Sequence, residues 1–145
     1  AKYYFGKVTM YPQLERTSRE MILYFMQKHF PDKEKLVTVR PELNLPILTD
    51  LEWLASIFNN ENYRDDYKTL VKQVRERGAA VPPLVNAYMN LSPTLRSFGT
   101  ALNPGFGNVE ETGLLVTLSD MFEEKVKRHL TYDKEATPSH LIQIK

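Results

Sequence analysis

Two adjacent carboxylates, Glu110 and Glu111, are the candidates for catalysis in this chain of 145 residues. They follow a glycine-rich turn and come just before an apolar stretch, residues 114–118, that is typical of an inner strand. A carboxylate in that position can hold a substrate amine or act as a general base. Alternatively, the pair is only solvated at the start of the strand. Beyond these two residues, the sequence assigns no catalytic group.

Other common chemistries have no matching residue pattern. The three histidines, His29, His129 and His140, are far apart, so we expect no metal site. The absence of cysteine excludes disulfides, thiol nucleophiles and thiolate metal ligands. The sequence contains no phosphate-binding loop, dinucleotide fingerprint or nucleophile elbow, and we expect no resident cofactor.

The composition is typical of a single globular domain. A net charge of +1 argues against a nucleic-acid binder, which usually carries a basic stripe. No stretch approaches the ~20 apolar residues that span a bilayer, and no signal peptide is recognisable. We therefore expect a cytoplasmic protein. The chain opens directly on KYYFGKVTMYP, which looks like a strand from the middle of a sheet, so we expect a piece of a longer protein.

We predict a mixed α/β (α+β) fold in which a small sheet positions the two carboxylates. Strands are expected over residues 2–10, 35–40 and 113–118, the first of them central in the sheet. About five helices should surround it. Capping-box patterns at residues 17–20, 49–52 and 120–123 would open three, and residues 63–77 and 83–91 have helical spacing. Residues 92–107 are expected to form a long loop, and residues 141–144 could add an edge strand.

The predicted helix over residues 21–30 is apolar on most of its sides. Such a helix belongs in a core or against a partner. Alternatively, it lies on a membrane surface and gives the protein a peripheral contact with the membrane. An excised piece would also expose a sheet edge, so a homodimer is an additional expectation.

The stretch VPPLVNAYMNL, followed by NPGFGNVEETGLLVTLSDM, resembles the C-terminal part of bacterial lipid N-acyltransferases. The opening KYYFGKVTMYP and the helix after it are also similar to that family. These enzymes serve ornithine- and glycine-lipid synthesis, are related to acyl-homoserine-lactone synthases and often carry the label "hemolysin". The residues that carry the resemblance are Pro82, Pro83, Leu84, Tyr88, Phe106, Asn108, and Glu110 or Glu111 before the apolar strand.

The resemblance implies a partial acetyltransferase-like sheet in residues 1–130, followed by a polar tail over residues 131–145. It implies transfer of a fatty acyl chain from acyl carrier protein to an amino-acid or aminolipid amine, at the inner face of the membrane. The acyl carrier protein thioester would be the donor. The family's main catalytic strand lies upstream of this sequence, so the fragment alone is expected to be inactive.

Several residues would contribute to the substrate path in this interpretation. Thr9 and Tyr11 would line the acyl path, and Glu110 or Glu111 would steer the amine. The other residues expected to bind substrate are Tyr88, Phe106 and Asn108. A second hypothesis remains open, in which the chain is a binding or assembly module that keeps the sheet without chemistry of its own.

Overall fold

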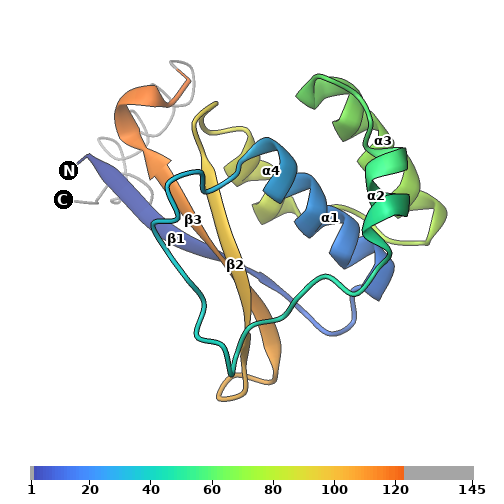
Figure 1. The fold of residues 1–145 in the computed structure, drawn as a ribbon, viewed down its shortest axis with the longest axis horizontal. Helices are drawn as coiled ribbons and strands as arrows, with labels where there is room; N and C mark the ends of the chain where they lie inside the picture. Colours follow the sequence, from blue (N-terminus) through green and yellow to red (C-terminus); the bar gives the residue numbers. More distant parts are fainter. Residues whose placement is uncertain (1, 123–145) are drawn as a thin grey trace, which may run out of the picture.

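A three-stranded antiparallel sheet with helices on one side forms the fold (Figure 1). The computed structural model describes residues 2–122. Strand β3 (Val109–Thr117) lies in the centre of the described sheet, between β1 (Tyr3–Met10) and β2 (Arg96–Asn103). The helices are α1 (Arg16–His29), α2 (Leu51–Ile57), α3 (Tyr63–Glu76) and α4 (Pro83–Met89), and a 3₁₀ turn spans Leu118–Asp120. The predicted mixed α/β class is therefore confirmed.

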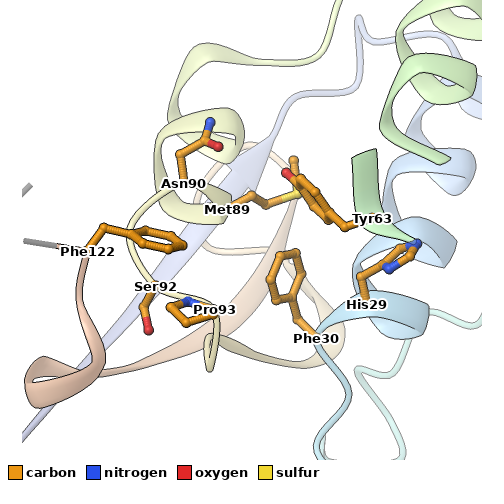
Figure 2. A pocket seen from close by; sticks show the side chains of 8 residues that line it. All are labelled: His29, Phe30, Tyr63, Met89, Asn90, Ser92, Pro93 and Phe122. Atoms are coloured by element: carbon orange, nitrogen blue, oxygen red, sulfur yellow. The ribbon is translucent and has the colours of Figure 1, made fainter. Parts of the chain in front are cut away.

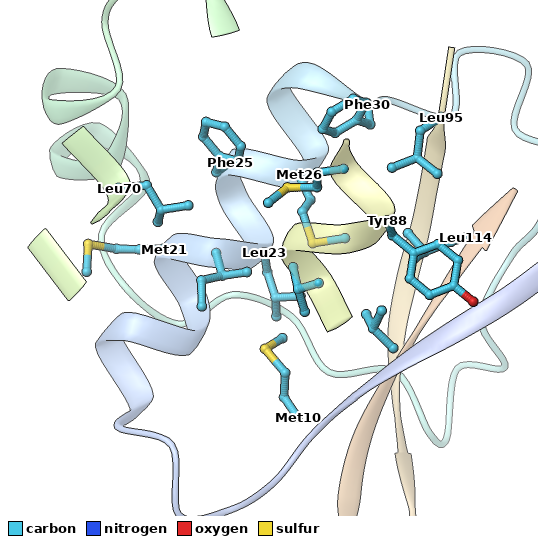
Figure 3. Packing of buried hydrophobic residues seen from close by; sticks show 14 of the residues in the cluster. Met10, Met21, Leu23, Phe25, Met26, Phe30, Leu70, Tyr88, Leu95 and Leu114 are labelled. Carbon is cyan, nitrogen blue, oxygen red and sulfur yellow. The ribbon is translucent and has the colours of Figure 1, made fainter. Parts of the chain in front are cut away.

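Helix α1 is the main element that covers the sheet. Its apolar residues are buried together with residues of β1, α3, α4 and β3, as Figure 3 shows for Met10, Leu70, Tyr88 and Leu114. Beyond α1, as seen from the sheet, lie α2 and α3 (Figure 1). The core interpretation of residues 21–30 is thus confirmed, because Met21, Ile22, Leu23, Phe25, Met26 and Phe30 are all buried. Among the described residues, no helix is long and apolar enough to cross a membrane.

Two of the predicted strands differ from the structure. Residues 35–40 do not form a strand: they have no regular secondary structure, Lys35 has φ +52°, and most of their side chains are exposed. Instead, residues 43–45 lie beside β2, where Leu45 N–H donates to Thr100 O (2.9 Å) and Leu102 N–H donates to Leu43 O (3.0 Å). Strand β2 itself falls in the stretch expected to be a loop. The first strand, expected in the centre, lies at an edge of the described sheet.

Two helix caps also differ from the capping-box predictions. The carboxylate of Glu15, not the hydroxyl of Thr17, accepts hydrogen bonds from the first backbone N–H groups of α1. Burial raises the pKa of Glu15, but the hydrogen bonds from Ser18 and Thr17 together outweigh it and lower the pKa to about 2. The cap of α2 is Asp50, one residue after the predicted Thr49. The capping box predicted at residues 120–123 ends outside the described residues. The edge strand predicted at residues 141–144 lies wholly outside them.

Candidate functional sites

The two adjacent carboxylates lie on opposite faces of β3, because successive side chains of a strand alternate. Glu110 faces the helices and forms an ion pair with Arg19 of α1, at 2.5 Å between Nη1 and Oε2. Both side chains are nearly inaccessible, at 6% exposure for Arg19 and 11% for Glu110. The Glu110 carboxylate is therefore occupied by an ion pair that connects α1 to the sheet.

Glu111 faces the outer side of the sheet, away from the helices. Its carboxylate contacts the ammonium group of Lys7 on β1 at 2.7 Å and accepts a hydrogen bond from Asn103 Nδ2 at 3.2 Å. Thr9 lies directly opposite Glu111 in the β1–β3 register. The structure thus brings Thr9 and Glu111 together, as two of the predicted site residues, and adds Lys7 and Asn103, which the sequence alone did not single out.

The remaining predicted residues divide between this end of the sheet and the core. Tyr11 follows β1 at its exposed end, and Phe106 and Asn108 lie in the turn between β2 and β3, where Asn108 has φ +56°. All three are thus near the start of β3, as is Glu111. Tyr88 is not: it is buried beneath the other half of β1, stacked on Tyr4 with its hydroxyl 3.2 Å from the Tyr4 hydroxyl.

The outer face of the sheet changes from polar to apolar along β3. Beyond Glu111 comes Gly113, over which the rings of Phe5 and Phe98 stack with their centroids 5.9 Å apart. Next comes a hollow of about 460 Å³. Its lining is mostly apolar: Tyr3, Phe5, Leu36, Val37, Phe98, Leu115 and Thr117, with Glu34 and Arg96 completing it. Tyr3 and Phe5 remain more than half exposed.

A second hollow, the His29 pocket, lies on the helical side of the molecule (Figure 2). Its volume is about 310 Å³, near the lower end of the range for ligand sites, roughly 300–1,000 Å³. The pocket lies between the end of α1, the start of α3, the end of α4 and the chain after β3. It is lined by His29, Phe30, Tyr63, Met89, Asn90, Ser92, Pro93 and Phe122.

A buried carboxylate fixes the imidazole on the wall of the His29 pocket. Asp66 of α3 is fully buried, and its Oδ2 lies 2.7 Å from His29 Nε2 and 2.6 Å from Lys28 Nζ. Asn60 donates two further hydrogen bonds to Oδ1. Burial raises the pKa of Asp66, but the hydrogen bonds from Lys28, His29 and Asn60 outweigh it and hold the pKa below its usual value. The His29 ring therefore has a fixed orientation.

Tyr63 contributes an unusual polar group to the same pocket. Its hydroxyl is buried and has no hydrogen-bond partner among the described residues. A buried hydroxyl without a partner costs about 1–3 kcal/mol. Burial, with a smaller effect of Tyr67, raises the pKa of Tyr63 to about 12, so the group stays protonated and can donate to a ligand. No spacing rule in the sequence connects Tyr63, His29 and Asp66, which explains why sequence reasoning missed this pocket.

Two proteins that this chain resembles are named as N-acyltransferases. One is the glycine N(α)-acyltransferase of Phocaeicola vulgatus, which is 54% identical over 129 residues, covering 89% of this chain and 39% of the relative. The glycine N(α)-acyltransferase of Bacteroides thetaiotaomicron is 50% identical over 140 residues, covering 97% of this chain and 41% of the relative. This chain therefore spans about two-fifths of the length of these relatives.

These matches confirm the resemblance to part of a bacterial N-acyltransferase that the sequence motifs indicated. No family profile matches the chain, and no solved structure matches it. The three-stranded sheet and the helices that cover it are consistent with a part of an acetyltransferase-like fold.

Proposed function

We propose that this chain is the C-terminal part of an acyltransferase that moves a fatty acyl chain from acyl carrier protein to the amine of an amino acid. The observation that carries the proposal is the 50–54% identity to two glycine N(α)-acyltransferases over nearly the whole chain. Glycine is accordingly the first acceptor to test. The carrier-protein donor and a role in membrane-lipid synthesis come from the motif resemblance and are part of the proposal.

In this proposal, the outer face of the sheet binds the reactants. The neutral amine nitrogen attacks the thioester carbonyl carbon, a C–N bond forms and the C–S bond breaks. The nitrogen loses one proton, and the carrier thiolate that leaves takes up a proton to become the thiol. The Glu111 carboxylate, beside Lys7 and Thr9, would attract the ammonium group of the acceptor and orient the amine. Both carboxylates have an ion-pair partner, but Glu110 is the weaker candidate because its pair with Arg19 is buried, whereas Lys7, the partner of Glu111, is 57% exposed.

The apolar hollow on the same face is suited to an acyl chain. Its aromatic and aliphatic lining begins with the rings of Phe5 and Phe98 over Gly113 and continues to Leu115, so a chain could extend from the polar end along β3. Each methylene that leaves water there contributes about 0.8 kcal/mol. The remaining catalytic groups would come from the part of the acyltransferase outside this chain, and the fragment alone should be inactive.

The test is acyl transfer by the full-length protein that contains this segment. Purified enzyme is incubated with a C16 acyl–carrier-protein thioester and glycine, and the product is measured by mass spectrometry. Wild-type enzyme should form N-acylglycine. Glu111→Gln should lose roughly tenfold or more in kcat/KM if the carboxylate orients the amine through a charge-assisted hydrogen bond.

The matched control is Glu42→Gln, which removes an exposed carboxylate whose one ion-pair partner among residues 2–122 is the exposed Arg40. This variant should keep wild-type activity. A folded wild-type protein that forms no N-acyl product with glycine, other amino acids or aminolipids would refute the proposal. It would favour the hypothesis of a binding or assembly module.

A further inference from the structure

We propose that helix α3 holds the protein on an anionic membrane surface through a row of four basic side chains. This basic row consists of residues that are all exposed: Arg64, Lys68, Lys72 and Arg75. The inference deepens the proposed function and rests on it in one respect, the choice of a membrane as the partner. The product of that reaction would be an amino acid that carries a fatty chain, and such an amphiphile enters membranes.

The spacing of the basic row places it on one narrow face of α3. At 3.6 residues per turn, its four members fall within an arc of about 80° around the helix axis. Leu70 and Val74, which are buried in the core together with residues of α1, lie on the opposite side of α3. The basic row therefore points away from α1 and the core.

The charges of the basic row are not neutralised within the described fold. None of the four side chains forms an ion pair among the described residues. Arg64 and Lys68 are four residues apart, as are Lys68 and Lys72, and like charges at that spacing disfavour a helix. Asp65 and Glu76 lie along one flank of the row, outside its arc. An anionic surface would relieve a repulsion that these neighbours leave in place.

Exposed apolar side chains border the other flank of the basic row. There the hydroxyl of Tyr67 donates a hydrogen bond to Asn86 Oδ1 of α4 at 2.6 Å, so α4 lies beside this part of α3. Leu84, two residues earlier in α4, is 55% exposed, and Ala87 is also exposed. Proteins that lie on membranes combine basic residues with apolar side chains that enter the lipid. The surface formed by α3 and α4 offers both.

The position of the basic row favours a membrane over the acyl carrier protein as its partner. Helix α1 lies between α3 and the sheet, so the row and the outer face of the sheet are on opposite sides of the described fold (Figure 1). A carrier protein bound at α3 would hold its thioester on the wrong side of the fold for the proposed acyl transfer. A membrane bound at α3 leaves the outer face open to a carrier protein in solution.

The experiment is co-sedimentation of the full-length protein with lipid vesicles. One set of vesicles contains phosphatidylcholine alone, and the other contains equal parts of phosphatidylcholine and phosphatidylglycerol. We expect binding to the anionic vesicles only. This binding should be lost when the salt concentration rises from about 0.1 M to 1 M, since the screening length falls from about 10 Å to 3 Å. Binding to neither set, or equal binding to both, would overturn the proposal.

Two matched double variants locate the contact. Lys68→Gln with Lys72→Gln removes two charges of the basic row and should weaken vesicle binding roughly twentyfold, because each basic residue contributes about fivefold at an anionic surface. Lys2→Gln with Lys33→Gln removes two exposed charges elsewhere and should bind like the wild type. An equal loss in both variants would attribute the binding to net charge and overturn the proposal, as would unchanged binding of the first variant.

A soluble polyanion distinguishes a lipid surface from an acidic protein. Leu84→Gln should weaken binding to anionic vesicles and leave binding to polyglutamate unchanged, because only the vesicle has an apolar interior. If polyglutamate binds as tightly as the vesicles and Leu84→Gln has no effect on either, the partner is an acidic protein and the membrane proposal is wrong. These readouts measure binding and not turnover, so a failure of acyl transfer in the wild type bears on the proposed function and leaves the vesicle outcomes unchanged.

Discussion

Substitution by glutamine should have different effects at the neighbouring residues Glu110 and Glu111. At Glu110 it should lower the stability of the protein, and at Glu111 it should lower the rate of acyl transfer. Glu110→Gln removes the only charge that pairs with Arg19 among the described residues and leaves a guanidinium group buried at 6% exposure. Removal of one partner of a buried ion pair costs about 3–5 kcal/mol. Since native domains are stable by only about 5–15 kcal/mol, this is a large fraction of the total. The expected decrease in the melting temperature is roughly 10–20 °C.

Glu111→Gln breaks a pair whose lysine is 57% exposed. Exposed ion pairs contribute about 0–1 kcal/mol, so the free energy of unfolding should change little. Under the proposed function, Glu111→Gln lowers the rate of acyl transfer instead. Urea-induced unfolding followed by circular dichroism, with the transfer assay on the same preparations, measures both effects.

A double substitution tests whether the ion pair explains the stability effect. Arg19→Met with Glu110→Leu removes both charges, and such apolar replacements of buried pairs are often neutral or stabilising. It also removes Arg19 Nε, a buried donor without a partner among the described residues. We expect the double variant to recover most of the stability lost in Glu110→Gln. The reasoning is refuted if Glu110→Gln is as stable as the wild type, or if the double variant is the least stable of the set.

Two further predictions concern packing and acid stability. Gly6→Val should destabilise the protein by about 1–3 kcal/mol in thermal unfolding, because a Cβ at Gly6 would lie 2.7 Å from the Tyr88 hydroxyl; Gly105→Val, with no atom nearer than 3.5 Å, should be tolerated. Burial raises the pKa values of Glu20 and Asp66, but hydrogen bonds outweigh it and hold them below 4.5 and 3.8, respectively. Their stabilisation is therefore complete above pH about 5 and is lost as the pH falls through the lowered values. Glu20→Gln and Asp66→Asn should each flatten the decrease in stability between pH 5 and 3, and unchanged pH profiles would contradict this.

The elements that the sequence predicted well are those whose patterns are local. The amphipathic spacing of residues 63–77 corresponds to α3, and Pro83 begins α4, where a missing backbone N–H has no cost. The strand pattern of residues 2–10 corresponds to β1. In each case the signal lies within one continuous stretch, so no distant contact is needed to interpret it.

Strand β2 was missed because distant residues determine it. It contains polar residues and Gly99, and its pairing with β3 shifts register between Ser97 and Thr100. Ser97 is fixed by α1: its backbone N–H donates to Phe30 O at 2.8 Å, and its hydroxyl lies 3.1 Å from Met26 O. Conversely, residues 35–40 have a strand pattern but no strand partner in the described sheet. A strand requires a neighbour, and residue pattern alone does not supply it.

The register of β1 on β3 explains why the candidate site could be predicted only in part. Motif resemblance marked Glu110 and Glu111 as equivalent, and their spacing gave no reason to prefer either. Antiparallel pairing sets Met10 against Glu110 on the helical face and Thr9 against Glu111 on the outer face. Arg19 then occupies the first carboxylate, and only the second remains beside the apolar hollow. A shift of one residue would exchange their roles, so the pairing register, and not the acidic pair itself, selects Glu111 as the candidate for chemistry.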